Sequence, residues 1–172
     1  MKQIERRNFL RESNLIWRVD DRLIHGQVII GWCEQLPIRL LVVCDDQIAT
    51  TDWEKELLLM AAPAKLPTRI LSTGETAEQI EDWIARDVIV MILIKSPAVL
   101  KKLVDLGCEI QTVNVGGIHF QENRKEFLPY LFLSNEDVEI FKQLMAKGIR
   151  FECQDLPNAP VYDLQKLIEK KQ

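Results

Sequence analysis

The sequence predicts an α/β fold, with an open, mostly parallel sheet of about six or seven strands and helices on both of its faces. Short apolar runs alternate along the chain with segments that carry helix-capping signals. Several of these runs are apolar throughout, which is typical of strands buried on both faces of a parallel sheet. Ligands of such sheets bind in loops beyond the carboxyl ends of the strands, and the loop after the first predicted strand carries the reactive side chains.

Strands are predicted where short runs are rich in β-branched and other apolar side chains. The run that contains Pro129 is expected at an edge of the sheet, because proline cannot donate a hydrogen bond to a neighbouring strand. The predicted strands are Leu15–Val19, Arg39–Cys44, Arg69–Leu71, Val88–Ile94, Glu109–Val115, Phe127–Leu133 and Ile149–Gln154.

Helices are predicted between these strands. The first carries Val28, Trp32 and Leu36, which repeat at one-turn spacing. Capping boxes predict two helix starts, at Thr51–Glu54 and at Thr76–Gln79. The remaining signals are Ser96-Pro97 with Gly107, Ser134 with Gly148, and a last helix over Asp163–Lys170.

The composition is that of an ordinary globular protein, with 47% hydrophobic residues and a formal net charge of -4. This charge gives no reason to expect nucleic acid or an anionic membrane as a partner. The longest apolar run, Val88–Ile94, is far shorter than the ~18 residues of a spanning helix, so no membrane insertion is predicted. The four cysteines have neither Cys-x-x-Cys spacing nor a histidine at zinc-ligand spacing, so we expect buried thiols and no metal site.

One domain is predicted over residues 14–172, preceded by a polar extension over residues 1–13. Within the extension, Glu5–Arg11 resembles a twin-arginine export signal. Such a signal continues into an apolar segment, whereas Glu12-Ser13-Asn14 follows here. Export is therefore not expected, and the sequence predicts a cytoplasmic protein.

The loop after the first predicted strand concentrates charged and polar side chains. A histidine beside aspartate and arginine can be a surface ion-pair cluster of little energetic value. The position of this cluster, at a strand-to-helix turn, favours a functional interpretation. Its members are Arg18, Asp20, Asp21, Arg22, His25, Gly26 and Gln27.

His25 is the candidate nucleophile, because a neutral imidazole nitrogen can attack a phosphoryl group and form a covalent intermediate. The second ring nitrogen must be held so that the correct tautomer is present. Asp20 or Asp21 can accept a hydrogen bond from that nitrogen, and the sequence leaves this choice open. The other histidine, His119, has no comparable sequence neighbours and is interpreted as a loop residue, with a partner contact as the lesser alternative.

Donors for the phosphoryl oxygens are present in the same loop. Arg18 and Arg22 carry permanently charged guanidinium groups that can meet the charge on these oxygens in the transition state. Gly26 lets the backbone approach closely, and Gln27 follows it at the start of the predicted helix. The free N–H groups of residues 26–28 can bind an anion there.

The loop and its flanks read Arg18-Val19-Asp20-Asp21-Arg22-Leu23-Ile24-His25-Gly26-Gln27-Val28. This run resembles the signature of the IIB component of the mannose/fructose/sorbose family of the bacterial phosphotransferase system (PTS). The resemblance covers roughly residues 14–170 and is supported by three shorter matches, Val113–Gly117, Leu133–Asp137 and Ser96-Pro97.

The resemblance implies a phosphoryl carrier for sugar uptake. His25 would accept a phosphoryl group on Nδ1 from the phosphohistidine of a separate IIA chain. It would pass the group to a sugar, of the mannose, fructose and sorbose class or a related hexose or amino sugar, that the membrane subunits IIC and IID translocate. Arg18, Asp20 and Arg22 match the family's phosphate loop, and the covalent phosphohistidine requires no cofactor. The domain would be cytoplasmic and peripherally associated with the membrane subunits.

Two further loops are candidates for an auxiliary role at the same site. Ser72 and Thr73 follow the third predicted strand and can complete an anion cradle next to His25, or belong to a loop before a helix capped at Thr76. Gly116-Gly117 is interpreted as a backbone turn that needs positive φ, because the glycine fingerprint of nucleotide loops is missing.

Two alternative functions remain open. A phospho-acceptor receiver domain would use Asp45 as acceptor and Lys95 as its lysine, but Asp45 ends the second predicted strand where that fold requires the third. A IIB-like module without a transport role, acting as a phosphorylation-dependent regulator, is compatible with the same residues.

Overall fold

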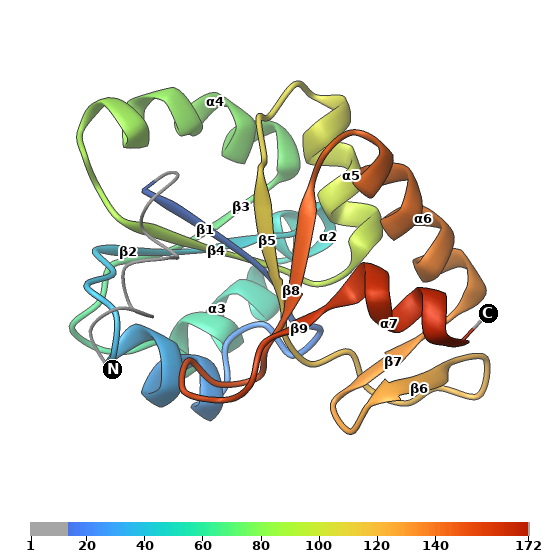
Figure 1. Cartoon of the computed structure of the whole chain (residues 1–172). Helices are drawn as coiled ribbons and strands as arrows, with labels where there is room; N and C mark the ends of the chain where they lie inside the picture. Colours follow the sequence, from blue (N-terminus) through green and yellow to red (C-terminus); the bar gives the residue numbers. More distant parts are fainter. Residues whose placement is uncertain (1–13, 172) are drawn as a thin grey trace.

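The computed structural model describes residues 14–171, which form a seven-stranded sheet with helices on both faces and a separate two-stranded sheet (Figure 1). This confirms the predicted α/β class; the extension predicted over residues 1–13 lies outside the described residues. The order of the large sheet is β3-β2-β4-β1-β5-β8-β9, with only β9 antiparallel to its neighbour. The strands are β1 (Leu15–Val19), β2 (Leu40–Cys44), β3 (Thr68–Leu71), β4 (Val90–Ile94), β5 (Thr112–Val115), β6 (Lys125–Leu128), β7 (Leu131–Leu133), β8 (Arg150–Cys153) and β9 (Tyr162–Asp163).

Two hydrophobic clusters cover the opposite faces of the sheet. Every residue of β1 is buried, and its alternate apolar side chains belong to different clusters. Trp17 and Val19 belong to the cluster beneath helices α4 to α7, and Ile16 belongs to the cluster that includes side chains of η1, α2 and α3. Figure 1 shows α4 and α3 on either side of the sheet. The helices are η1 (Gln27–Cys33), α2 (Asp46–Thr50), α3 (Asp52–Ala61), α4 (Thr73–Ala85), α5 (Pro97–Asp105), α6 (Asn135–Ala146) and α7 (Leu164–Lys171).

The prediction of one edge strand over Phe127–Leu133 was wrong. The segment contributes to the hairpin of β6 and β7, a two-stranded sheet separate from the large one, and Pro129 and Tyr130 form the turn between the two strands. Proline removes a ladder donor and favours a turn, so it interrupts the run rather than placing it at the edge. The edge beyond β8 is formed by β9, whose two residues are too few to show a period in the sequence.

Some of the predicted helix starts are confirmed and others are wrong. Ser96 and Ser134 cap α5 and α6, as predicted, and the latter forms a capping box with Asp137. The predicted box at Thr76 was wrong, because Ser72 caps α4 through a reciprocal contact with Glu75 one turn earlier. Thr51 precedes α3 but makes no side-chain cap, since its hydroxyl donates to the carbonyl of Gln47 instead.

The first helix differs in type from the prediction. It is a π-helix over Gln27–Cys33, and Leu36 lies beyond its end although its side chain is buried. Val28 and Trp32 of this helix are fully buried, which confirms that the predicted apolar face of the helix packs against the core. π-helical turns are rare and are frequently found at functional sites.

The topology places the loop after β1 at a switch point. From β1 the chain passes through η1 to β2 on one side, whereas from β5 it passes through α6 to β8 on the other side. The loops after β1 and β5 therefore leave the carboxyl edge of neighbouring strands in different directions, which is where ligands bind in open α/β sheets. Within residues 14–171, no helix combines the length and apolar character needed to cross a membrane.

Candidate active site

The loop between β1 and η1 is held against its neighbours by backbone hydrogen bonds. Asp20 N donates to Ile94 O of β4 (2.9 Å), and Asp21 N donates to Gly117 O after β5 (2.8 Å). Leu23 and Ile24 are buried side chains within the loop, and Leu23 has a φ of 56°. A β-carbon in this left-handed region is strained, and such strain is concentrated at functional sites.

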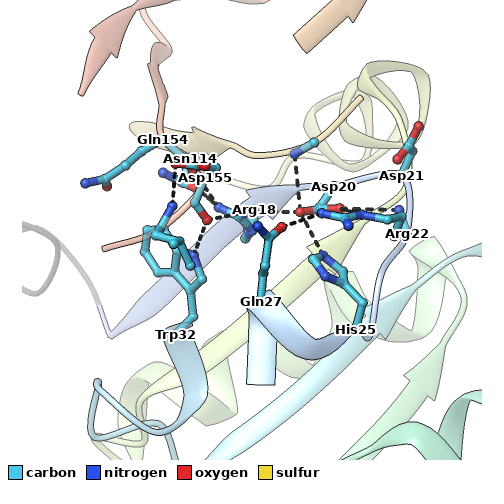
Figure 2. A network of polar contacts seen from close by, with 12 residues as sticks. Arg18, Asp20, Asp21, Arg22, His25, Gln27, Trp32, Asn114, Gln154 and Asp155 are labelled. Carbon is cyan, nitrogen blue, oxygen red and sulfur yellow. Dashed lines mark hydrogen bonds and ion pairs between the residues drawn. The ribbon is translucent and has the colours of Figure 1, made fainter. Parts of the chain in front are cut away.

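Asp20 lies at the centre of the polar network (Figure 2). Its carboxylate is fully buried, and Oδ2 accepts from Arg18 Nη2 at 2.9 Å and from Gly117 N at 3.3 Å. Oδ1 accepts from the backbone N–H of Arg22 at 3.3 Å. Burial alone would raise the pKa of Asp20, but the contacts with His25 and Arg18 outweigh burial and hold this pKa below its ordinary value. Asp20 is therefore an anion in the folded protein at neutral pH.

His25 is oriented by Asp20 and not by Asp21. Nε2 of His25 lies 3.2 Å from Oδ2 of Asp20, and the imidazole is mostly covered, with 14% of its side-chain surface exposed. This arrangement favours the tautomer with the proton on Nε2, because the carboxylate is an acceptor. Nδ1 is then the ring nitrogen that carries a lone pair for a reacting group.

Arg18 is a buried support for Asp20. Its guanidinium donates to Asn114 Oδ1, to Gln154 O at 2.9 Å and to Asp155 O at 3.2 Å, and it lies 4.8 Å from the ring centroid of Trp32. Burial lowers the pKa of Arg18, although Asp20 partly offsets this effect. Of its two predicted parts, phosphate binding or orientation, the fully buried side chain is suited only to orientation.

Gly116 is required by the position of Arg18. A Cβ at Gly116 would lie 2.1 Å from Nη2 of Arg18 and 2.7 Å from Oδ2 of Asp20, so any side chain there would overlap the ion pair unless Arg18 moved. The prediction of positive φ at Gly116-Gly117 was wrong, because the glycines with positive φ in the described part of the chain are Gly107 and Gly148. Close approach of a side chain, and not backbone conformation, explains the glycine here.

Arg22 and Gln27 form the solvent-facing side of the site. The guanidinium of Arg22 donates from Nη2 to Oε1 of Gln27 at 2.7 Å, and 41% of the Arg22 side chain is exposed. Gly26 lies between His25 and Gln27 in the chain, and a Cβ there would meet nothing within 4 Å, so the backbone is open at Gly26. Ile29 N donates to His25 O at 3.0 Å, and among the described residues the N–H groups of 26–28 have no backbone acceptor.

Ser72 and Thr73 do not join this site. β3 is separated from β1 by β2 and β4, which places the two residues roughly 14 Å away at the usual strand spacing. Their donors are also occupied, since Ser72 caps α4 with Glu75 and Thr73 donates from N and Oγ1 to Asp46 at 2.8 Å. The predicted second anion cradle is therefore not formed.

The acidic residues after β2 have structural contacts. Asp45 caps α2 by accepting from Gln47 N and Ile48 N, and Asp46 binds Thr73 and Lys102. Both aspartates therefore stabilise the start of α2 and its neighbours. Residues 14–171 contain no cluster of three or more histidine, cysteine or acidic side chains that could hold a metal ion.

Several site residues were missed in the sequence. Asn114 belongs to β5, and Gln154 and Asp155 follow β8; they meet Arg18 only because β5 lies next to β1 and β8 lies next to β5. A polar Asn114 inside an apolar strand was the one available signal, since buried amides need partners. His119 was interpreted without neighbours, yet its Nδ1 lies 2.6 Å from Oδ1 of Asp21.

Comparison with known proteins identifies the family. The family model for the PTS system sorbose subfamily IIB component matches residues 14–172. The chain belongs to this family. A fructose-specific EIIB component of the PTS from Bacillus subtilis (strain 168) is 29% identical over 151 residues, which are 88% of this chain and 93% of that protein.

Two further proteins are similar to this chain over most of its length. The mannose-specific EIIAB component from Escherichia coli (strain K12) is 30% identical over 153 residues, and this chain spans 47% of its length. The crystal structure of the PTS N-acetylgalactosamine-specific IIB component 1 from Escherichia coli has a TM-score of 0.78 and 28% identity, covering 87% of this chain and 97% of that one. The chain is thus a sugar-specific IIB component of the fructose, mannose and sorbose class.

The four cysteines of this IIB component are not competing nucleophiles. All are free, and Cys44 and Cys153 are buried. Burial raises the pKa of Cys33 and of Cys44 to about 12, so these thiols stay protonated at neutral pH. Because the thiolate is the reactive form, Cys33 and Cys44 are poor nucleophiles at neutral pH.

Proposed function

We propose that this IIB component carries a phosphoryl group on Nδ1 of His25. It accepts the group from the phosphohistidine of a IIA protein and transfers it to a sugar that the membrane subunits IIC and IID translocate. The reaction is that of a protein-phosphohistidine–sugar phosphotransferase, with the covalent phosphohistidine in place of a cofactor. The protein works in the cytoplasm, in peripheral association with the membrane subunits, and takes no nucleic acid partner.

The contact between Asp20 and His25 carries this proposal. Nε2 of His25 lies 3.2 Å from the Asp20 carboxylate, which favours the proton on Nε2 and leaves the lone pair on Nδ1 available; the carboxylate also stabilises the positive charge that the ring acquires as it attacks. In the first step the bond between phosphorus and the IIA histidine breaks as the bond to Nδ1 of His25 forms. The electron pair of the broken bond returns to the IIA imidazole.

The residues of the His25 loop suit a loose transition state, in which charge is spread over the equatorial oxygens of the phosphoryl group. Arg22 supplies a fixed charged donor, and the open space beside Gly26 admits the group. In the second step a sugar hydroxyl attacks phosphorus, the bond to Nδ1 breaks, and the hydroxyl proton passes to a base or to water. His25 then returns to its starting form.

The regulatory alternative uses the same phosphorylated His25 but has no sugar acceptor. The receiver-like alternative is less suited to the structure, since the carboxylate of Asp45 is occupied by two backbone donors of α2. An acyl phosphate on aspartate is lost most readily in base, whereas phosphohistidine is lost in mild acid. Acid lability therefore distinguishes the two acceptors.

The experiment is phosphorylation by phosphoenolpyruvate, the general phosphorelay proteins and a cognate IIA. Acid-labile label is expected on the wild-type protein and is expected to disappear in His25→Ala, with Arg69→Ala on β3 as a folded control. Label that persists in His25→Ala would contradict the assignment. Membrane vesicles with IIC and IID then test the acceptor: label passing to sugar supports transport, and label retained with every sugar supports the regulatory alternative.

A further inference from the structure

Asp21 holds a second histidine next to the proposed site. Nδ1 of His119 lies 2.6 Å from Oδ1 of Asp21, and the backbone N–H of His119 donates to Oδ2 at 2.8 Å. The adjacent carboxylates Asp20 and Asp21 therefore face two different histidines, through opposite ring nitrogens. Asp20 faces Nε2 of His25, so Nδ1 is the ring nitrogen that remains available. Asp21 faces Nδ1 of His119, so Nε2 is the one that remains available there.

His119, Arg22 and Asp20 converge on the space above Gly117. A Cβ built at Gly117 would lie 3.0 Å from Cε1 of His119 and 3.5 Å from both Nη2 of Arg22 and Oδ1 of Asp20. Cε1 is bonded to both ring nitrogens, so the Cε1–H corner of the imidazole faces this convergence, with Nε2 one bond away. The His119 side chain is 48% exposed, and within the part of the chain that the structure describes Nε2 has no partner.

The imidazole is not needed to hold its own loop. Ile118 exchanges backbone hydrogen bonds with Tyr130 and Phe132 at 3.0 and 2.8 Å, and Asp21 N donates to Gly117 O at 2.8 Å. Arg124 Nη1 donates to the carbonyl of His119 at 2.9 Å. The loop is thus fixed through main-chain groups, and a half-exposed ring paired with a carboxylate adds little to its stability.

We propose that His119 is a further catalytic residue, which donates a hydrogen bond from Nε2 to an oxygen of the phosphoryl group while the group is transferred to or from His25. This role rests on the proposed function of His25. The ring acts as an imidazolium between two anions, with Nδ1–H donated to Asp21 and Nε2–H to the phosphoryl oxygen. No proton changes place in this step, and the phosphorus–nitrogen bond forms on His25 alone.

The charges around His119 are consistent with this role. Asp21 faces its Nδ1, Asp20 and Arg22 face it across Gly117, and Arg124 lies beside its carbonyl, 3.9 Å from Asp21. Arg22 and His119 together would place cationic donors on two sides of a dianionic group. Charge-assisted hydrogen bonds of this kind are roughly twice as strong as neutral ones.

The test compares His119→Ala and His119→Gln with Gln121→Ala, an exposed substitution in the same loop. Phosphoryl transfer from phosphorylated IIA is measured by rapid quench, and label on wild-type His25 is established first. We expect His119→Ala to slow transfer roughly tenfold or more. His119→Gln, whose amide nitrogen can replace the Nε2 donor, should recover most of the rate, and Gln121→Ala should match the wild type.

A second measurement reports contact with the phosphoryl group directly. The ³¹P resonance of phosphorylated His25 is expected to shift in His119→Ala and not in Gln121→Ala. A normal rate and an unshifted resonance in folded His119→Ala, with His25 labelled, would overturn the role of His119 alone. Equal loss in the Ala and Gln variants, in step with lowered thermal stability, would overturn it in favour of a structural role. Absence of label on wild-type His25 would instead overturn the proposed function and this inference with it.

Discussion

Nε2 of His25 lies 3.2 Å from Oδ2 of Asp20, and the same oxygen accepts from Arg18 at 2.9 Å. The imidazole of His25 is therefore connected through one buried carboxylate to a guanidinium that is buried in the protein interior. This chain of contacts assigns different parts to two arginines that look alike in the sequence. Arg18 contacts the Asp20 carboxylate from the protein interior, and Arg22 lies on the solvent-exposed side of the site.

Arg22→Ala is predicted to slow phosphorylation of His25 by about 100-fold, because it removes a charged donor worth ~3 kcal/mol in the transition state. Its side chain is 41% exposed, so the thermal midpoint should change little. Rapid-quench transfer from phosphorylated IIA measures the rate, with Arg69→Ala as the control for loss of an exposed arginine. An unchanged rate in a folded Arg22 variant would remove it from the mechanism.

Arg18→Leu is predicted to destabilise the fold by roughly 3–5 kcal/mol, because it leaves the charge of Asp20 buried without its partner. The matched control is Arg86→Ala, which breaks a solvent-exposed pair with Asp82 and should change the free energy of unfolding by less than about 0.5 kcal/mol. Urea unfolding measures both. An equal loss of unfolding free energy in the two variants would show that burial of the Arg18–Asp20 pair does not increase the cost of breaking it.

Gly116→Ala is predicted to destabilise the protein by about 1–3 kcal/mol, since its methyl group would overlap the Arg18 guanidinium. Gly74→Ala in α4 is the control: a Cβ there meets nothing within 4 Å, so a neutral or slightly stabilising effect is expected. In an Arg18→Leu background the cost of Gly116→Ala should fall, because the overlapping atoms are gone. Full additivity of the two changes in a double-mutant cycle would contradict this explanation.

Acid is predicted to remove the stabilisation that Asp20 provides. The pKa of Asp20 is lower in the folded protein than its ordinary value, so the unfolded chain binds the proton more readily. The contribution is complete above about pH 4, near the ordinary pKa of an aspartate, and is lost as pH falls through the lower folded pKa. Wild type and Asp20→Asn should therefore differ in unfolding free energy more at pH 6 than at pH 3. A gap that does not narrow would contradict the lowered pKa.

Local features of the fold could be predicted because their causes lie within a few residues. Ser96 and Ser134 cap helices through the N–H group three residues later, and Gly107 and Gly148 end helices with positive φ. Pro129 was recognised as incompatible with a central strand. Whether it would mark an edge or a turn depended on which strands found partners, and that is not a local property.

The helix start at α4 shows the limit of local reasoning. Ser72 with Glu75, and Thr76 with Gln79, both satisfy the spacing of a capping box. The end of β3 at Leu71 and the contact of Thr73 with Asp46 select the earlier start. Both selecting features arise from neighbours that are remote in sequence.

By itself, the sequence determined the chemistry that this IIB component can use: a histidine, two aspartates and two arginines at a strand-to-helix turn. Only the tertiary structure decided which aspartate faces His25, which arginine is buried, and that His119 lies beside Asp21. The physical reason is that parallel pairing of β1 with β5 brings together groups almost a hundred residues apart, such as Arg18 with Asn114 and Asp21 with His119. Directional hydrogen bonds between those groups exist only after the sheet has formed.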